Sequence, residues 1–293
     1  VVEPGKLHPR SVVIPAHVVD MIVVAEDRET EHRQCVESVF DPTVTGDAAA
    51  PEGTVEAAAS IPLARRLIAQ RAMQELHPGD VSNLGQGIPS EIAALVRESP
   101  LAGKVTFTIE SGVNGGLPKP VPDFGIAVAP RSIMRQDDQF MFYNGGGLDV
   151  AFLGFAEVAA NGDMNVSRFG GRLVGCGGFL DIAQPSRRLV FCGTMLAGKS
   201  ALTLADGGLT VSNDTGARKF VDTLQQLTFS AARARRGEQQ ILYVTERCVF
   251  DVVAGGLRLI EVAPGVDVER DILAHMPFRP LVAETIHQIY IAP

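Results

Sequence analysis

Hydrophobic residues first recur with a helical period between Ser60 and His77. Ser60 is a favourable N-cap residue, Pro62 suits the first turn, and His77-Pro78-Gly79 is a stop signal. The apolar positions in between fall on one helix face: Leu63, Leu67, Ile68, Met73 and Leu76. The pattern predicts a helix over 60–77.

The next segment predicts a strand, a glycine turn, a helix and a second strand. The run Val81 to Leu84 precedes the turn Gly85-Gln86-Gly87, and a helical pattern begins at Pro89 and Ser90. A β-rich run, Val105 to Ile109, follows. Two strands joined in this way are parallel, with a right-handed crossover. Ligands bind at the carboxyl ends of such strands, which is where Gly85 to Pro89 and Glu110 lie.

After Glu110 the helical period gives way to short apolar runs bounded by Gly, Asn or Asp. We predict strands at 12–14, 18–25, 140–143, 150–153, 189–192, 209–212, 240–245, 248–253 and 257–262. Val268 to His275 is predicted as a short helix with an acidic start. The fold class is therefore α/β: an open, mainly parallel sheet with flanking helices and a strand-rich second part.

A change of composition predicts a domain boundary. Residues 41–59 are rich in Ala, Gly, Pro, Glu and Thr and have no apolar period, so we expect a linker or a long surface loop. This segment separates residues 1–40 from a main domain over 60–293. The sequence starts at Val1 and has no signal-peptide pattern, so we expect a processed chain or a fragment.

Composition and charge then narrow the function classes. Of the 293 residues, 46% are apolar and 20% are charged, which is typical of a globular protein. Lys and Arg number 26 against 34 Asp and Glu, a net charge of −8 without any basic run, which argues against nucleic-acid binding. The apolar stretches fall far short of the roughly 20 residues that span a bilayer. We expect a soluble, cytoplasmic protein.

The cysteines and histidines predict neither a disulfide framework nor a metal site. The four cysteines form no C-x-x-C pair, so we expect buried free thiols in a reducing compartment: Cys35, Cys176, Cys192 and Cys248. One cluster has metal-like residue types: Glu29, Glu31, His32 and Cys35. A solvated polar run explains it better, because zinc requires four convergent ligands.

The first chemical motif is a glycine loop. Gly85 to Ser90 reads G-x-G-x-x-S, follows a strand and opens a helix, and Glu110 ends the next strand about 20 residues on, as in a dinucleotide-binding fold. Ser90 occupies the place of the third glycine, so a tight strand–helix turn stays open as the alternative. A Rossmann-type oxidoreductase is one function that this motif allows.

The second motif, Gly193 to Ser200, matches G-x-x-x-x-G-K-[ST] and would suit a nucleotide-binding module. A P-loop must run into a helix whose amides hold phosphate. Here Asp206-Gly207-Gly208 stops the segment within two turns and a strand pattern resumes at Leu209, which is typical of a hairpin. We interpret the match as coincidence and expect Lys199 on a loop.

The third motif is Glu110-Ser111-Gly112 with Gly115-Gly116. A carboxylate at the end of a buried strand, beside glycines, can act as a nucleophile, although many such acids only cap turns.

Four segments in order carry a family resemblance: 110–116 (ESGVNGG), 142–154 (FYNGGGLDVAFLG), 165–172 (NVSRFGGR) and 175–179 (GCGGF). From about Ser60 to its end the chain resembles the family I CoA-transferases, and within them the propionate and short-chain acyl-CoA:acetate or 3-ketoacid enzymes. Residues 2–25 resemble the end of the family's other half. The resemblance implies two related α/β halves, fused or as separate subunits, with the active site at their junction.

For this chain the resemblance implies the C-terminal, or β, half. Glu110 matches the glutamate that becomes a glutamyl-CoA thioester, the loop Gly85-Gln86-Gly87-Ile88-Pro89 matches a CoA-contacting loop, and Gly177-Gly178 matches the oxyanion-binding region. The implied partners are an acyl-CoA, a short-chain carboxylate and an N-terminal half, within an oligomer. Coenzyme A is the implied substrate and covalent intermediate, without a permanently bound cofactor. An acyl-CoA hydrolase on the same scaffold is the alternative.

The residues suit this chemistry. Transfer of CoA between carboxylates needs a carboxylate nucleophile and oxyanion donors but no general base, and an oxyanion donor is typically worth about 2.7–4 kcal/mol. Glycines such as Gly177 and Gly178 let the backbone approach closely. Because the net charge is −8, a local basic rim must help to hold anionic CoA; the candidates by residue type are Lys119, Arg168, Arg172 and Lys199.

Overall fold

The computed structural model describes residues 2–33, 35–36, 40–49, 61–119 and 122–291. It divides into two compact units, Val1–Asp41 and Pro42–Pro293. The described residues include no helix long and apolar enough to cross a membrane.

The first unit contains short helical turns, and the strands predicted there are wrong. Its elements are η1 (Pro9–Ser11), η2 (Ala16–Val18) and α1 (Arg28–Glu31). Over 12–14 and 18–25 the described chain forms no strand, and Ile22 and Val23 are 78% and 86% exposed. An apolar run becomes a strand only when a neighbouring strand pairs with its backbone and covers one of its faces.

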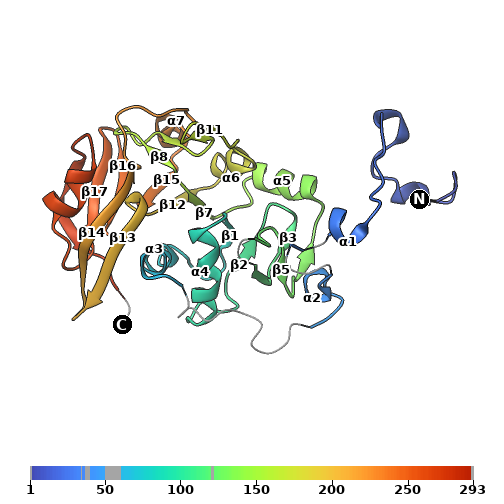
Figure 1. The fold of residues 1–293 in the computed structure, drawn as a ribbon, viewed down its shortest axis with the longest axis horizontal. Helices are drawn as coiled ribbons and strands as arrows, with labels where there is room; N and C mark the ends of the chain where they lie inside the picture. The colour runs from blue at the N-terminus through green and yellow to red at the C-terminus, as the bar shows by residue number, and fades with distance from the viewer. Residues whose placement is uncertain (1, 34, 37–39, 50–60, 120–121, 292–293) are drawn as a thin grey trace. The chain divides into compact units, whose positions relative to one another are not determined.

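The second unit is built on a ten-stranded mixed sheet (Figure 1). Five parallel strands form its centre, in the spatial order β15 (Gln240–Val244), β12 (Arg188–Cys192), β7 (Val150–Gly154), β1 (Val81–Leu84) and β2 (Thr106–Thr108). Beyond β15 lie β16 (Cys248–Val253), β17 (Gly256–Val262) and β18 (Leu281–Gln288), and beyond β2 lie β3 (Val113–Asn114) and β6 (Ser132–Ile133). The predicted βαβ unit and the α/β class are confirmed, although antiparallel pairs extend both sides.

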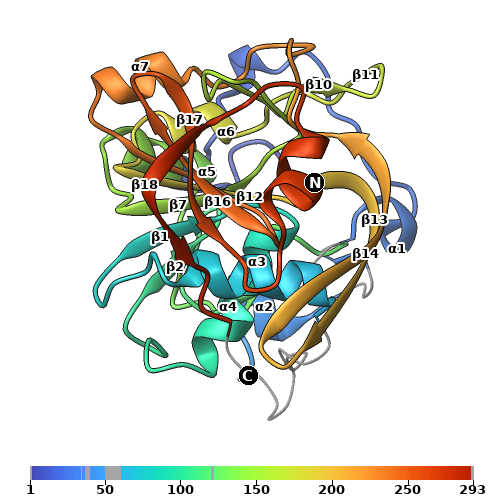
Figure 2. The same cartoon turned by 90° about the vertical axis from the view of Figure 1, so that its left-hand side faces the viewer.

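Two hydrophobic cores cover opposite faces of this sheet, and Figure 2 shows helices on both of its faces. Successive residues of β7 alternate between them: Val150 and Phe152 pack with α3 (Leu63–Met73) and α4 (Ile88–Arg97), whereas Ala151 and Leu153 pack toward the other helices. Those are α5 (Gln136–Asn144), α6 (Phe179–Ala183) and α7 (Ala231–Arg236). A parallel strand buried on both faces reads as a continuous apolar run, which is why the central strands could be predicted.

Smaller elements complete the unit. Four two-stranded ribbons are formed by β4 (Leu117–Pro118) with β5 (Ala127–Val128), β8 (Glu157–Val158) with β9 (Met164–Asn165), β10 (Arg168–Phe169) with β11 (Arg172–Leu173), and β13 (Leu196–Ala205) with β14 (Gly208–Arg218). The helix predicted over 268–275 is a π-helical turn, Val268–Ile272, and a 3₁₀ turn, Leu273–His275. Helix α2 (Pro42–Thr45) lies in the segment predicted as a linker, of which 50–59 are outside the described residues.

Three predicted details change. Residues 140–143 belong to α5 and not to a strand: Phe140 and Tyr143 face inward while Met141 is 72% exposed, which is a helical and not an alternating pattern. The helix predicted over 60–77, which is α3, ends at Met73, before His77, and Ser60 lies outside the described residues. The sequence pattern also missed β18, an edge strand whose side chains are mostly exposed.

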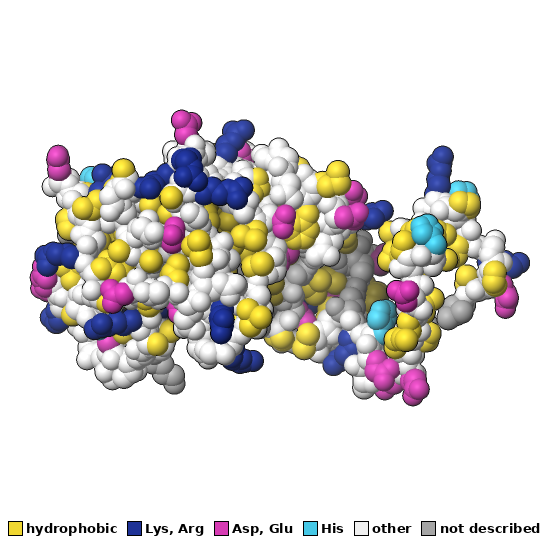
Figure 3. Space-filling model, turned by 90° about the horizontal axis from the view of Figure 1, so that it is seen from above, with side chains coloured by type: hydrophobic (Ala, Val, Ile, Leu, Met, Phe, Trp, Pro, Cys, Tyr) yellow, Lys and Arg dark blue, Asp and Glu magenta, His cyan; other side chains and the backbone are white. Residues whose placement is uncertain are grey.

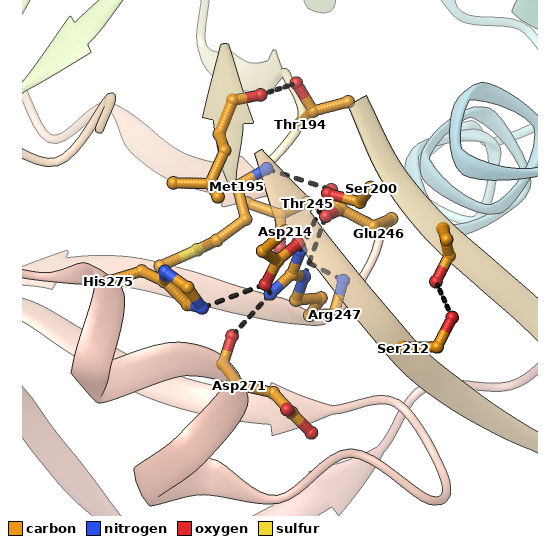
Figure 4. Close-up of polar contacts among 12 residues, drawn as sticks. Thr194, Met195, Ser200, Ser212, Asp214, Thr245, Glu246, Arg247, Asp271 and His275 are labelled. Carbon is orange, nitrogen blue, oxygen red and sulfur yellow. Dashed lines mark hydrogen bonds and ion pairs between the residues drawn. The ribbon is translucent and has the colours of Figure 1, made fainter. Parts of the chain in front are cut away.

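A buried charge network ties the β13–β14 hairpin to the sheet (Figure 4). Arg247 follows β15, and its side chain is fully buried. Its Nη1 donates to Asp214 Oδ2 at 2.7 Å and its Nε donates to Glu246 Oε1 at 2.9 Å. Oδ2 of Asp214 also lies 2.9 Å from Nε2 of His275. The guanidinium therefore neutralises two acids that come from different parts of the chain.

We expect Arg247→Ala to lower the free energy of unfolding by about 3–5 kcal/mol, because it removes the cation beside buried Glu246 and one of the two basic side chains beside Asp214. Arg279→Ala is the matched control, since Arg279 and Glu269 form a pair in which both side chains are more than two-thirds exposed, 69% and 67%, and should cost less than about 1 kcal/mol. Urea titration followed by circular dichroism measures both. Equal losses in the two variants would contradict the structural role of Arg247.

Candidate active site

Glu110 lies in a tight turn at the carboxyl edge of the parallel strands, between β2 and β3. The amide of Gly112 donates to Ile109 O at 3.0 Å, and the amide of Ile109 donates to Val113 O at 2.8 Å. Gly112 has φ = +109°, and a Cβ built on it would lie 2.0 Å from Met134 O. Only glycine fits at this position, so the sequence Glu-Ser-Gly sets the shape of the turn that presents the carboxylate.

Buried polar side chains hold both ends of this turn. On the β2 side, the hydroxyl of Tyr143 donates to Thr108 Oγ1 at 2.9 Å, and Asn83 Nδ2 donates to Tyr143 Oη at 3.2 Å. On the β3 side, Asn114 Nδ2 donates to Gly112 O at 3.0 Å and to Gln139 Oε1 at 2.8 Å. Tyr143 and Gln139 are both fully buried on α5. One helix thus fixes the backbone before and after Glu110.

Burial raises the pKa of the Glu110 carboxyl, and desolvation is the only cause found. Among the ion pairs of the described residues, none includes Glu110. The nearby Tyr143 hydroxyl also has a raised pKa, through its burial and, to a smaller extent, through the charge of Glu110. A half-buried acid without a counter-charge is a common signature of a functional group.

Gly178 lies directly beside the Glu110 carboxylate. A Cβ built on Gly178 would lie 2.9 Å from Glu110 Oε2 and 2.8 Å from Cζ of Phe140. Gly177 precedes it with φ = +50° and open space around it, and Gly178 caps α6. Within the described part of the chain, the backbone amides of Gly177 and Gly178 donate no hydrogen bond. The fold therefore brings together two predicted site segments that are distant in sequence.

The loop Gly85-Gln86-Gly87-Ile88-Pro89 connects β1 to α4, on the strand next to β2. The amide of Gly85 donates to Phe152 O at 2.8 Å, and Gly87 has φ = +89°. Ser90 Oγ donates to Gly87 O at 2.8 Å, so the residue in place of the third glycine closes the turn. Gln86 is exposed, Ile88 is partly buried and Pro89 is buried. The loop and Glu110 thus occupy the same edge of the sheet.

The P-loop match is part of a hairpin, as the sequence predicts, and no helix follows it. Lys199 lies within β13 and not on a loop, which corrects that detail, because β13 extends to Leu196 through pairing with β14. The amide of Met195 donates to Glu246 Oε2 at 2.9 Å (Figure 4), so an acid occupies a place where a phosphate would have to bind. Ser200 Oγ accepts from Arg247 at 3.0 Å.

The metal-like cluster of residues 29–35 contributes a local backbone contact. Glu31 Oε2 accepts the backbone N–H of Glu26 at 2.7 Å, and no convergent group of His, Cys, Asp or Glu suited to a metal occurs in the described ranges. All four cysteines are free, and only Cys176 is partly exposed. Burial raises the pKa of the Cys248 thiol to about 12.

Sequence reasoning missed the part of the site that α5 provides: Gln139, Phe140 and Tyr143. It assigned 140–143 to a strand, so these side chains had no predicted relation to Glu110. The helical signal was present, since Asp137 and Asp138 lie in the first turn and Gly145 follows the last residue.

No family model matches the chain, but curated relatives and solved structures do. It is 39% identical over 283 residues to the acetate CoA-transferase YdiF of Escherichia coli O157:H7, covering 96% of this chain and 52% of the relative. It is 38% identical over 290 residues to the caffeate CoA-transferase of Acetobacterium woodii, covering 97% and 54%. The chain thus spans about half the length of these relatives.

Among solved structures, the acyl-CoA transferase YdiF from E. coli O157:H7, in a thioester complex with CoA, superposes with a TM-score of 0.83 at 36% identity. The superposition covers 99% of this chain and 53% of that one. The decarboxylase AibA/AibB shares the fold, with a TM-score of 0.60 at 21% identity over 80% of this chain and 91% of its own.

We expect Glu110→Gln to raise Tm at pH 7. The folded state raises the pKa of this carboxyl, so ionisation costs stability above the unfolded pKa of about 4.3. The gain should shrink as the pH falls below that value, where the wild-type carboxyl is protonated in both states. Thermal melts between pH 4 and 8 measure it, with exposed Glu284→Gln as control. A Tm at pH 7 below that of the wild type would contradict the uncompensated burial.

Proposed function

Because the chain belongs to the family I CoA-transferases, we propose that it carries the nucleophile for CoA transfer between a short-chain acyl-CoA and a free carboxylic acid. The observation that supports this best is the Glu110 carboxylate, which is desolvated, without an ion-pair partner in the described chain, and beside Gly178. The E. coli relative, whose structure is a thioester complex with CoA, supports the same chemistry.

The reaction would proceed in two halves on Glu110. A carboxylate oxygen attacks the acyl-CoA carbonyl, and the carbon–sulfur bond breaks to give a mixed anhydride and CoA thiolate. The thiolate then attacks the glutamyl carbonyl and releases the first carboxylic acid as its carboxylate, leaving a glutamyl-CoA thioester. A second carboxylate runs the same steps in reverse, so CoA serves as substrate and covalent intermediate and is not a permanent cofactor.

Each step passes through an oxyanion, for which we assign the amides of Gly177 and Gly178 as donors. They donate to no other group among the described residues, and Gly178 lies against Glu110. One such donor typically lowers the barrier by about 2.7–4 kcal/mol. We assign Gly85 to Pro89 to contact with CoA, because this loop follows the strand next to β2 on the same edge.

A second half, fused or as a separate polypeptide, would complete the site. Two relatives are by name single subunits of larger enzymes, the succinyl-CoA:3-ketoacid coenzyme A transferase of Helicobacter pylori and the 3-oxoadipate CoA-transferase of Acinetobacter baylyi. Apolar side chains are exposed close to Gly178 in sequence, with Leu173 at 76% and Val174 at 60%. Figure 3 shows hydrophobic side chains on the surface of the molecule among charged and polar ones. Two exposed apolar side chains that adjoin in sequence, as Leu173 and Val174 do, suit burial against a partner.

Glu110→Ala should abolish transfer while CoA binding persists, because the loop at Gly85 to Pro89 is untouched. Glu110→Asp keeps the charge but withdraws the carboxylate by one methylene, and a misplacement of about 1 Å costs on the order of 10²-fold when catalysis depends on positioning. Transfer from acyl-CoA to acetate measures the rates, and intact-mass analysis detects the CoA adduct.

Peptide mapping after borohydride reduction should locate the modification on the peptide that contains Glu110. Near-wild-type transfer by Glu110→Ala, or an adduct on another peptide, would rule out this nucleophile. If the adduct forms on Glu110 but water hydrolyses it to free CoA and no new acyl-CoA forms from the acceptor carboxylate, the protein is an acyl-CoA hydrolase.

The chain alone should be weakly active, and addition of its complementary half should restore turnover. A charge at the exposed apolar face, Leu173→Asp, should weaken the association, because the buried carboxylate would be desolvated without a partner. Analytical ultracentrifugation of the mixed halves measures assembly. Turnover by the pure 293-residue chain at about 1–10³ per second would show that no second half is needed.

A further inference from the structure

Phe140 is an apolar side chain that lies beside Gly178, on which the proposed nucleophile also borders. Its Cζ and Glu110 Oε2 both approach the point where a Gly178 Cβ would stand, at 2.8 and 2.9 Å. The ring meets Tyr143 edge to face, with centroids 5.9 Å apart and an interplanar angle of 83°. The ring therefore lies next to the point at which Glu110 and Gly178 approach each other.

The rest of α5 keeps this ring in place. Gln139 and Tyr143, on either side of Phe140 in the helix, bond to Asn114 and Thr108, which flank the Glu110 turn. The helix cannot shift relative to Glu110 without breaking these hydrogen bonds and leaving buried polar groups unsatisfied. Met141, the next residue, points to solvent.

We infer that Phe140 is a positioning residue that keeps water away from the glutamyl thioester and sets the spacing between Glu110 and Gly178. The inference rests on the proposed function. It accounts for the desolvated carboxylate, which has no charged partner within the described residues and needs an apolar neighbour to exclude water. It also accounts for a glycine at 178, where any side chain would meet the ring.

The chemical consequence is control over whether the glutamyl thioester reacts with an acceptor carboxylate or with water. An acceptor carboxylate and a water molecule compete for the same glutamyl carbonyl. When water wins, its oxygen bonds to that carbonyl carbon, the carbon–sulfur bond breaks, and the water protons leave with the thiol and the solvent as the Glu110 carboxylate is restored. Excluding water from a closed site prevents this side reaction. A smaller side chain at 140 would open a path for water.

Phe140→Ala should raise the ratio of acyl-CoA hydrolysis to CoA transfer about tenfold, which corresponds to about 1.4 kcal/mol between the two barriers. Phe140→Leu, which remains apolar, should fall between this variant and the wild type. Met141→Ala is the matched control on the same helix, because its side chain is 72% exposed. The protein is assayed together with its complementary half, by release of free CoA with and without acetate.

A purely structural effect would lower hydrolysis and transfer together and leave their ratio unchanged. A ratio for Phe140→Ala and Phe140→Leu equal to that of Met141→Ala would therefore overturn the inference; if Phe140→Ala does not fold, Phe140→Leu decides alone. Intact mass keeps the two proposals apart. If wild-type protein forms no CoA adduct on Glu110, the proposed function fails, whereas an adduct with an unchanged ratio refutes only the role of Phe140.

Discussion

The uncompensated burial of one carboxylate is the constraint on which the site depends. Glu110 loses part of its hydration without gaining an ion pair from any described residue, and its pKa rises accordingly. Such a group reduces stability and persists only where the surrounding structure holds it in place. Here the surroundings are a turn that requires Gly112, a glycine at 178, and a helix anchored by buried hydrogen bonds on both sides of the turn.

The sheet explains why these parts meet. Because β1 and β2 are parallel neighbours, the loop after β1 and the turn after β2 emerge at one edge. The same strands are buried on both faces, so the helices that pack on one face, α5 and α6, have a firm support. Helix α5 then contributes to both parts of the site, since Gln139 and Tyr143 hold the Glu110 turn while Phe140 contacts Gly178. Catalysis that relies on positioning needs such a rigid support.

Local patterns carried the predictions that the structure confirms. The βαβ unit combines a continuous apolar run, a glycine turn and a helical period within about 30 residues, and the P-loop match could be rejected from the residues just after it. The errors arise where the deciding signal lies outside the segment itself. Residues 140–143 form a short apolar run that alone fits a strand or a helix equally well, and the helical signals lie on either side of it, at Asp137, Asp138 and Gly145. Likewise, nothing near Gly178 in sequence indicates that it lies against Glu110, and only the family resemblance connected them.

Asp214 and Glu110 are both partly buried acids, but only Asp214 has a cationic partner among the described residues. Burial would raise the pKa of Asp214, yet hydrogen bonds from Arg247 and Ser200 and the charge of Arg247 lower it overall. That acid is held in its charged form by a partner, as in a structural ion pair. Burial likewise raises the pKa of Glu110, but no cation among the described residues lowers it again. An arginine paired with Glu110 would occupy the carboxylate oxygens and so hinder their attack on a carbonyl. In the proposed mechanism, the absence of such a partner from the described surroundings leaves this carboxylate free to attack, at a cost in stability that the rest of the fold offsets.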